Sequence, residues 1–307
     1  MTLHHPDLTL RPITGPDELD LFNRLPYVLN DEVAKDFKTG RRRPEWLWLA
    51  LRGDRVVARA AWWSRPGDEH PALMDFFDID GDVEDGVRLV ETALATLGTD
   101  PPDYLRYVPG DWRDQPEVRR GVEQRMGAME RLGAKLFVER LRLEWRPGTP
   151  LPEPAGRLTF RPVRDAEELI GLMTQVLDGT LDAHGIEELT RMTARESAEE
   201  LYRDELERYT TPHEWWRVAT LPDGEPVGFV IPAHNGYNPI IAYIGVLPAH
   251  RGHGYVDEVL AAGTRLLADE GVPRIRASTD VGNVPMARAF ARAGYVNFER
   301  QLDMTWR

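Results

Sequence analysis

The chain repeats its own pattern once along its 307 residues. The segment Leu8-Thr9-Leu10-Arg11-Pro12-Ile13 recurs as Leu158-Thr159-Phe160-Arg161-Pro162-Val163, at an offset of 158 − 8 = 150 residues. A glycine followed by an aromatic residue, two apolar residues and a tryptophan also recurs, at an offset of 294 − 133 = 161 residues: Gly133, Phe137, Leu141, Leu143 and Trp145 match Gly294, Phe298, Leu302, Met304 and Trp306. Such self-similarity predicts two copies of one structural plan.

The segment between the two copies is rich in proline and glycine, which is typical of a linker. We therefore predict an N-terminal domain over residues 1–146, a linker over 147–157 and a C-terminal domain over 158–307. Within each copy, a β-rich run turns back on itself at a tight turn, Gly53-Asp54 in the first and Asp223-Gly224 in the second.

Composition excludes several classes of protein. The chain has no cysteine, so disulfides, thiol nucleophiles and cysteine-ligated zinc are absent. A net charge of −13 repels nucleic acid and anionic membranes. The sequence contains no long apolar run, and we expect a cytoplasmic protein that binds no metal, no nucleic acid and no membrane.

The stretch 240–256 is the strongest candidate for a ligand site. An apolar run from Ile240 to Leu247 ends at Pro248, and a loop with Gly252 and Gly254 then leads into a helical pattern. Glycines let the backbone approach a ligand closely, and the free N–H groups at a helix start attract anions. The pattern indicates either a phosphate site or a simple tight turn.

This order of strand, Arg251-Gly252-His253-Gly254 and amphipathic helix resembles the acyl-CoA pyrophosphate loop of the GNAT superfamily of N-acetyltransferases. The order of elements over residues 158–307 is also that of the superfamily, and the pairing of two such domains is similar to mycothiol synthase, a bacterial small-molecule enzyme. The resemblance implies an α/β (α+β) fold of two tandem GNAT-like domains, each with a mixed, mainly antiparallel sheet flanked by helices.

The resemblance also implies a binding site for acetyl-CoA. The residues that correspond to the superfamily's cofactor site are Ile244, Gly245, Val246, Leu247, Arg251, Gly252, His253, Gly254, Tyr255, Val256, Asn283, Met286 and Phe290. Two of them depart from the superfamily's pattern, because Val256 replaces a small residue and Phe290 stands where a tyrosine usually serves as the general acid.

The catalytic base is harder to locate. The superfamily often uses a glutamate early in the strand before the loop, but residues 239–246 contain no carboxylate. Tyr243 is the strand's titratable side chain, so it is either a proton relay or part of the pocket lining. We expect Tyr237, Asn238 and Tyr243 to contact the acceptor substrate. The acidic segment 178–210 either forms a solvated helix face or contributes carboxylates to the acceptor site.

The first copy differs at the position of the phosphate loop. Its segment 76–86 carries five carboxylates, namely Asp78, Asp80, Asp82, Glu84 and Asp85, and these would repel a pyrophosphate. The spacing of Asp78, Asp80 and Asp82 resembles a calcium loop, but Val83 stands where that loop requires glycine. We therefore expect a structural domain without a CoA site.

The resulting hypothesis is an acyltransferase that moves an acetyl group from acetyl-CoA to a primary amine of a small molecule. Direct attack in a ternary complex is expected, since the chain has no cysteine to form an acyl-enzyme. One alternative is an acyl-CoA-binding or regulatory protein with little or no turnover, which Phe290, Val256 and the missing glutamate would favour. Another is a protein lysine acetyltransferase.

Overall fold

The computed structural model describes residues 8–98, 100–153 and 155–307, and it divides into two compact units. The N-terminal unit comprises the chain up to Glu139 together with 301–307, and the C-terminal unit comprises residues 140–300. Within the described ranges, no helix is both long and apolar enough to cross a lipid bilayer.

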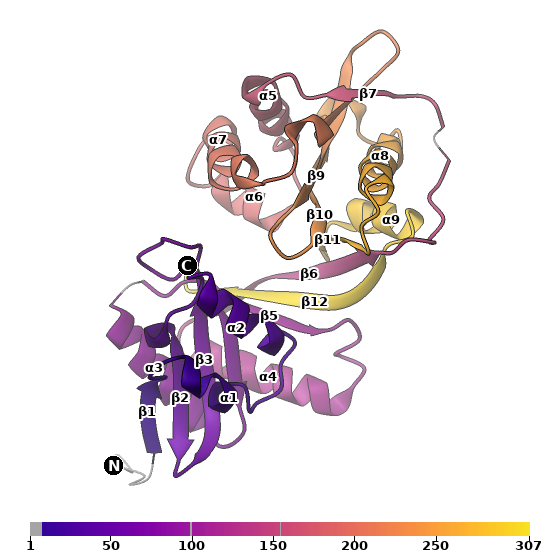
Figure 1. Ribbon diagram of the computed structural model, residues 1–307. Helices are drawn as coiled ribbons and strands as arrows, with labels where there is room; N and C mark the ends of the chain where they lie inside the picture. Colours follow the sequence, from indigo (N-terminus) through magenta and orange to yellow (C-terminus); the bar gives the residue numbers. More distant parts are fainter. Residues whose placement is uncertain (1–7, 99, 154) are drawn as a thin grey trace. The chain divides into compact units, whose positions relative to one another are not determined.

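The N-terminal unit is a sheet with helices on both faces (Figure 1). Its strands lie in the order β1-β2-β3-β4-β5, and the final residues of β12 complete it. The elements are β1 (Leu8–Pro12), α1 (Leu19–Phe22), α2 (Asn30–Lys38), β2 (Leu47–Arg52), β3 (Arg55–Trp63), β4 (Leu73–Ile79), α3 (Val83–Leu97), β5 (Tyr104–Pro109) and α4 (Pro116–Arg131).

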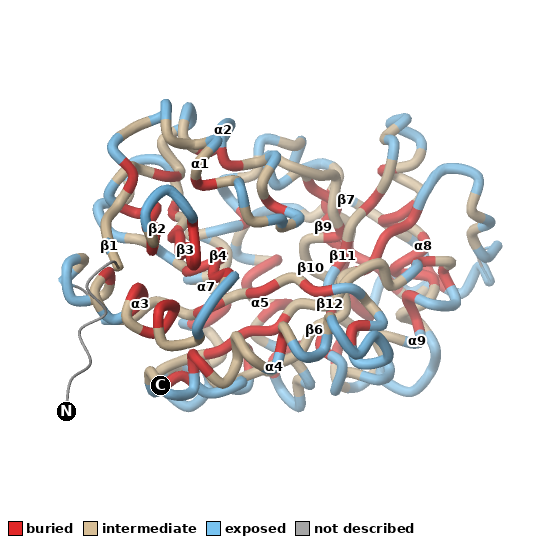
Figure 2. Tube along the Cα trace, turned by 90° about the horizontal axis from the view of Figure 1, so that it is seen from below, coloured by how far each residue is buried: buried red, intermediate tan, exposed pale blue. Residues whose placement is uncertain are grey.

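Strands β2, β3 and β4 are buried along almost their whole length, as the red segments of Figure 2 show. Helices cover both faces of these strands, so apart from the buried Arg59 the side chains inside β2 and β3 are apolar or small on both faces and do not alternate with polar residues. The expected turn between β2 and β3 is present, with Gly53 in the left-handed region at φ 58°.

The C-terminal unit has the same plan. Its strands lie in the order β6-β11-β10-β9-β8-β7, with α5, α6 and α7 on one face and α8 and α9 on the other (Figure 1). The elements are β6 (Lys135–Trp145), β7 (Thr159–Pro162), α5 (Ala166–Val176), α6 (Ala183–Glu188), α7 (Ala194–Asp204), β8 (Arg217–Thr220), β9 (Pro226–His234), β10 (Pro239–Val246), α8 (Tyr255–Asp269), β11 (Ile275–Asp280), α9 (Val284–Arg292) and β12 (Val296–Thr305).

These elements confirm the predicted fold class of mixed, mainly antiparallel sheets flanked by helices. Strand pairs β7–β8, β8–β9, β9–β10 and β11–β6 are antiparallel, and β10–β11 is parallel. The acidic segment 178–210 contains α6 and α7, and it packs over the sheet through Ala198 of α7 and Leu206 of the short helical turn that follows.

The unit boundaries differ from those that the sequence suggests, because the two copies exchange their closing strands. Residues 140–145 of β6 pair with β11 in the C-terminal unit, from Arg140 opposite Asp280 to Trp145 opposite Ile275. Residues 301–307 instead enter the N-terminal unit, where Met304 is buried in the core and Trp306 donates a hydrogen bond to the Leu132 carbonyl at 2.9 Å. The matching patterns of the two strands make this exchange possible, because each presents an equivalent apolar face.

The internal repeat extends to individual contacts. Arg11 and Glu18 form a paired hydrogen bond at 2.7 and 2.8 Å, and Arg161 and Glu168 form the same pair at 2.6 and 3.0 Å. The glutamates differ by 168 − 18 = 150 residues, the offset that the first strands show. In both copies this pair ties the end of the first strand to the helical segment that follows it.

The second of these pairs predicts an acid-sensitive contribution to stability. The hydrogen bonds from Arg161, and those from Arg164, lower the pKa of Glu168 from 4.5 to about 2, although burial acts in the opposite direction. A carboxylate whose folded-state pKa is depressed stabilises the fold above its unfolded pKa, and this contribution is lost as the pH falls from about 4.5 through about 2.

We expect Glu168→Gln to lower the free energy of unfolding by about 1–2 kcal/mol at pH 7, after allowance for solvent screening of the exposed arginines. Thermal unfolding followed by circular dichroism from pH 7 down to pH 2 measures the effect. The difference in melting temperature between wild type and variant should shrink as the pH falls. A difference that stays constant over this range would contradict the assignment.

Candidate active site

Strands β10 and β11 diverge within the C-terminal sheet. Both are fully described, and they pair in parallel at one position, Ile240 opposite Arg276, before they part. Opposite β9, the register of β10 shifts between Ile241 and Tyr243, so Ala242 is an extra residue in a β-bulge. A bulge bends a strand and re-aims its side chains. The divergence leaves one edge of β10 without a neighbouring strand.

A cavity of about 720 Å³ occupies this divergence. It is lined by residues 241–246 of β10, by Ser278 and Thr279 of β11, by the loop around Arg251, and by residues from the start of α9 and from α5–α7. Of the residues expected to bind the cofactor, those that line the cavity are Ile244, Gly245, Val246, Arg251, Gly252, Gly254, Tyr255, Val256, Asn283, Met286 and Phe290. Leu247 is instead buried in the core beneath α5 and α7, and His253 lies outside the cavity lining.

The glycine at position 245 allows α5 to approach β10. A Cβ atom there would lie 2.8 Å from Cγ1 of Val176, closer than real Cβ contacts allow. Glycine at this position therefore allows a helix of the same unit to approach the strand closely. The end of α5 is thereby held against the strand that lines the cavity.

The loop before α8 exposes main-chain amides. Gly252 and Gly254 adopt left-handed φ angles of 82° and 72°, and Gly254 is the N-cap of α8. Glycine has no side chain that could accept from the first amides of the helix, and those amides have no partner within the helix. The loop therefore offers N–H donors together with the positive end of the helix dipole.

Arg157 orients this loop from the opposite side. Its guanidinium donates to the carbonyls of His253 at 2.8 Å and Gly254 at 3.3 Å, and it forms an ion pair with the buried Glu258 at 2.7 Å. In a trans peptide the N–H points away from the C=O. The amides of Gly254 and Tyr255 consequently point away from Arg157. Arg157 falls in the proline-rich linker of the sequence, where no motif signals such a role.

Arg251 has a different role from the one expected. Its guanidinium donates to the carbonyls of Val176 at 2.7 Å, Asp178 at 2.6 Å and Val246 at 3.1 Å. A cation is favoured at the end of a helix, where carbonyls lack intrahelical partners. The side chain therefore joins the C-terminus of α5 to the end of β10 and does not extend into the loop as a phosphate ligand.

The remaining cofactor-site residues are placed by local structure. The Asn283 side chain caps α9 by accepting from the Met286 amide at 3.3 Å. Phe290 is 1% exposed and packs edge-on against Tyr295 with ring centroids 5.0 Å apart. The Tyr295 hydroxyl in turn bonds with the Thr264 hydroxyl at 2.8 Å. No proton can come from position 290.

The end of the cavity near α6 and α7 is polar. Arg140, Asp182, His184, Glu188, Ser197 and Tyr243 line it. Asp182 caps α6 by accepting from the Gly185 amide at 3.0 Å, and Arg140 forms ion pairs with Asp280 at 2.9 Å and Asp182 at 3.4 Å. Tyr237 and Asn238 are elsewhere, in the turn before β10, where the Asn238 side chain accepts from Arg274 at 2.9 Å. The structure therefore does not bring these two residues to the cavity.

Tyr243 is held in its neutral form. Burial raises the pKa of its phenol, the nearby charges of Asp182 and Glu188 raise the pKa further, and Arg251 opposes them weakly. Its ring packs edge-on against Phe229 at 5.2 Å. A phenol of raised pKa is a poor base but can still donate a proton or a hydrogen bond.

The N-terminal unit fills the corresponding space with side chains. Strands β4 and β5 also pair in parallel at one described position, Met74 opposite Tyr104. Beyond it, Asp78 accepts from Arg59 and from Arg106, both at 2.8 Å. Burial alone would raise the pKa of Asp78, but Arg106, Arg59 and Arg125 together hold it below its usual value.

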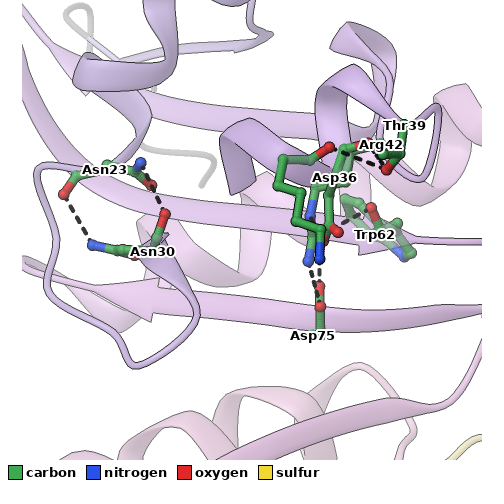
Figure 3. Close-up of polar contacts among 8 residues, drawn as sticks. Asn23, Asn30, Asp36, Thr39, Arg42, Trp62 and Asp75 are labelled. Atoms are coloured by element: carbon green, nitrogen blue, oxygen red, sulfur yellow. Dashed lines mark hydrogen bonds and ion pairs between the residues drawn. The ribbon is translucent and has the colours of Figure 1, made fainter. Parts of the chain in front are cut away.

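A second buried ion-pair cluster lies in the same unit (Figure 3). Arg42 donates to both oxygens of Asp75, at 2.8 and 2.5 Å, and to Asp36 at 3.2 Å. Figure 3 also shows the reciprocal bonds between Asn23 and Asn30. Buried charges with paired hydrogen bonds are strongly destabilised when one partner is removed. These clusters therefore fix the interior of the unit.

The carboxylates in the acidic segment of the first copy also have partners within the unit. The Asp82 side chain caps α3 by accepting from the Glu84 amide at 3.0 Å, and Asp80 forms an ion pair with Arg55 at 2.9 Å. Asp85 is paired with Arg52 at 2.8 Å. Where α8 begins with a glycine, α3 thus begins with its own carboxylate. Among the described residues, no cluster of three or more His, Asp or Glu side chains is arranged to hold a metal ion.

Comparison with known proteins identifies the C-terminal fold. Residues 157–296 match the family model described as an acetyltransferase (GNAT) domain. A GCN5-related N-acetyltransferase from Sphaerobacter thermophilus has a similar structure, with a TM-score of 0.64 at 16% identity over 99% of this chain and 96% of that one. A tandem GNAT protein from the clavulanic acid biosynthesis pathway gives a TM-score of 0.53 at 14% identity, over 97% of each chain.

No curated protein matches the chain's sequence at a significant level. At these identities the structural likeness establishes the fold, and the family model supplies the class of the domain. Residues 157–296 therefore match the acetyltransferase (GNAT) domain family, which indicates an acyltransferase, and the structural likeness over nearly the whole chain shows the same fold in both units.

Proposed function

We propose that the protein transfers the acetyl group of acetyl-CoA to a primary amine of a small molecule, by direct attack within a ternary complex. The observation that carries this proposal is the continuous lining of one cavity, which extends from the amide-rich loop at Gly252 and Gly254 to the polar end at Tyr243. The two ends match the two reactants in chemistry: an anion-binding loop for the pyrophosphate and a carboxylate-lined recess for an amine.

The cofactor end of the cavity offers several main-chain donors. The amides at the start of α8 suit a pyrophosphate. Beyond Ile240 the edge of β10 that faces β11 has no strand partner, so its main-chain groups can pair with the amides of a pantetheine arm. An amide between Ile244 and Val246 can then stabilise the charge that develops on the thioester oxygen.

The leaving group requires little help. A free thiol has a pKa near 8.5, so a thiolate can depart near neutral pH without a dedicated acid. This makes Phe290 compatible with turnover. Tyr243 lines the same cavity and keeps its proton, so we assign it as a hydrogen-bond donor toward the sulfur or the acceptor.

The N-terminal unit has a structural role in this proposal and binds no CoA. The buried ion pairs of Asp78 with Arg59 and Arg106 fill the space beside β4, and the Asp82 carboxylate takes the helix amide that a phosphate would need. The expected stoichiometry is therefore one acetyl-CoA per chain.

A charge placed in the loop tests the cofactor site. Gly252 has no atom within 4 Å of the position that a Cβ would occupy, and Asp and Asn both tolerate its left-handed backbone. We expect wild type to bind one acetyl-CoA per chain in isothermal titration calorimetry, and Gly252→Asp to weaken that affinity at least ~10-fold relative to Gly252→Asn, because like charges ~4 Å apart repel by up to ~4 kcal/mol.

The two variants have nearly the same shape, so strain in the loop cancels between them. The difference should decrease as salt is added, since it is electrostatic. Equal affinities for the Asp and Asn variants would remove the pyrophosphate from this loop. Failure of wild type to bind acetyl-CoA at millimolar concentration would end the proposal.

The tyrosine is tested by removal of its hydroxyl. We expect Tyr243→Phe to lower kcat by about 10- to 100-fold, within the range of single proton-transfer groups, while the affinity for acetyl-CoA stays unchanged. Because its pKa is raised, the phenol stays protonated past pH 10, and wild-type activity should show no loss from tyrosine ionisation below that pH. Unchanged turnover in the variant would restrict Tyr243 to lining the pocket.

A regulatory protein that binds acyl-CoA with little turnover is the second candidate, and Phe290 is the observation that favours it. Release of the CoA thiol, followed with a thiol reagent across a panel of amines, separates the two. Binding without any amine-dependent release would favour the sensor.

A further inference from the structure

Glu188 is a carboxylate at the polar end of the cavity, and it has taken no part in the contacts described so far. It is the last residue of α6, it is half-buried, and it lines the cavity together with Tyr243. Its Oε2 accepts from the Ser197 hydroxyl at 2.6 Å, and Ser197 is 4% exposed on α7. Two packed helices therefore fix the position of this carboxylate.

The other acidic residues around the cavity already have partners. Asp182 caps α6 and is paired with Arg140, and Asp280 accepts from the Ala183 amide at 2.6 Å while also paired with Arg140. Glu205 is exposed and accepts from the Tyr209 hydroxyl at 2.5 Å. Arg140 is therefore neutralised by two aspartates, and its charge is not available to Glu188.

Glu188 has no cationic partner anywhere in the described chain. A half-buried carboxylate without a counter-ion is unfavourable in the empty cavity, and an ammonium placed beside it would restore the balance of charge. The proximity of Glu188 and Tyr243 supports this position, since the charge of the glutamate is felt at the phenol. The strand β10 lacks a carboxylate, so the cavity's basic group comes from another element.

We propose that Glu188 binds the ammonium group of the acceptor amine and takes up its proton before attack. The inference rests on the proposed function, and it defines the acceptor as a small amine that is cationic near neutral pH. Ser197 is the positioning residue that holds the carboxylate toward the cavity.

The ammonium gives one proton to the Glu188 carboxylate, and the neutral amine attacks the thioester carbon. As the C–N bond forms, the C–S bond breaks, and the second amine proton passes to the departing thiolate to give the CoA thiol. Glu188 then releases its proton to water, so each turnover yields an amide, the CoA thiol and one proton.

Deprotonation of the acceptor ammonium is a large part of the free-energy barrier that Glu188 would lower. An alkylammonium with a pKa of about 10.4 requires roughly 4.6 kcal/mol to deprotonate at pH 7, at 1.36 kcal/mol per pH unit. A positioned base contributes typically about 10²- to 10⁴-fold to a rate.

The test compares Glu188→Gln with the neighbouring Glu187→Gln. Gln keeps the size of the side chain and its bond with Ser197, and Glu187 is paired with Arg191 at 2.7 Å outside the cavity lining. With acetyl-CoA saturating, kcat/KM is measured against pH for butylamine, 1,4-diaminobutane and lysine. We expect Glu188→Gln to lower kcat/KM at least 100-fold and to abolish the acidic limb of the profile, with partial rescue by Glu188→Asp and no effect of Glu187→Gln.

Binding of the same amines to the CoA-bound protein gives a readout that does not depend on turnover. Calorimetry should show affinity for wild type and Glu187→Gln, and at least a tenfold loss for Glu188→Gln. Ser197→Ala should shift the acidic limb without removing it. Equal amine affinity and an unchanged pH profile in Glu188→Gln, or no binding of any of the three amines to wild type, would overturn the assignment.

The two proposals fail in different ways. Absence of acetyl-CoA binding by the wild type defeats the proposed function, while the same amine titration, carried out on the protein without CoA, still reports on Glu188. If the wild type binds and uses acetyl-CoA and Glu188→Gln behaves like wild type, the proposed function stands, and another group must be the base.

Discussion

The parting of β10 from β11 after Ile240 is the constraint on which the rest of the site depends. In a sheet, main-chain N–H and C=O groups normally form hydrogen bonds with neighbouring strands. Along one edge of β10 these groups have no strand to bond with. The bulge at Ala242 bends the strand, and Gly245 lets α5 pack directly against it. The same strand thus presents open main-chain groups toward the cavity and also anchors the end of α5.

Arg251 joins the end of β10 to the end of α5. Its bonds to the Val176 and Val246 carbonyls tie the start of the loop before α8 to the helix that leads into α6. Arg157 holds the loop from its other side through the carbonyls of His253 and Gly254. These two arginines need not contact a phosphate themselves. They orient the main-chain amides that we propose to bind one.

The N-terminal unit has the same backbone plan, but different side chains occupy the space between its parallel strands. The gap beside β4 is closed by Asp78, Arg59 and Arg106, and the first amides of α3 meet the carboxylate of Asp82. The sequence predicted repulsion of a phosphate by acidic residues. In the structure these carboxylates are bound to arginines and to a helix start within their own unit.

Sequence patterns were sufficient for the features that depend on local chemistry. The repeat predicted two similar folds, and the glycines at 53, 224, 252 and 254 marked turns that do adopt left-handed backbone. Features that depend on long-range packing were not predictable. One partner of Arg251, Val176, lies 251 − 176 = 75 residues earlier. Glu188 belongs to a charge-rich segment whose pattern is typical of a solvated helix face, and its bond with Ser197 of α7 appears only in the folded structure.

The exchanged closing strands have a consequence for how the chain acquires its structure. During synthesis the N-terminal half emerges first, yet its core includes Met304, and Trp306 bonds to the Leu132 carbonyl. Domains usually fold as units as they leave the ribosome. Here the earlier unit lacks part of its sheet and core until residues 301–307 have been made. The order in which the chain is synthesised therefore differs from the order in which its units can be completed.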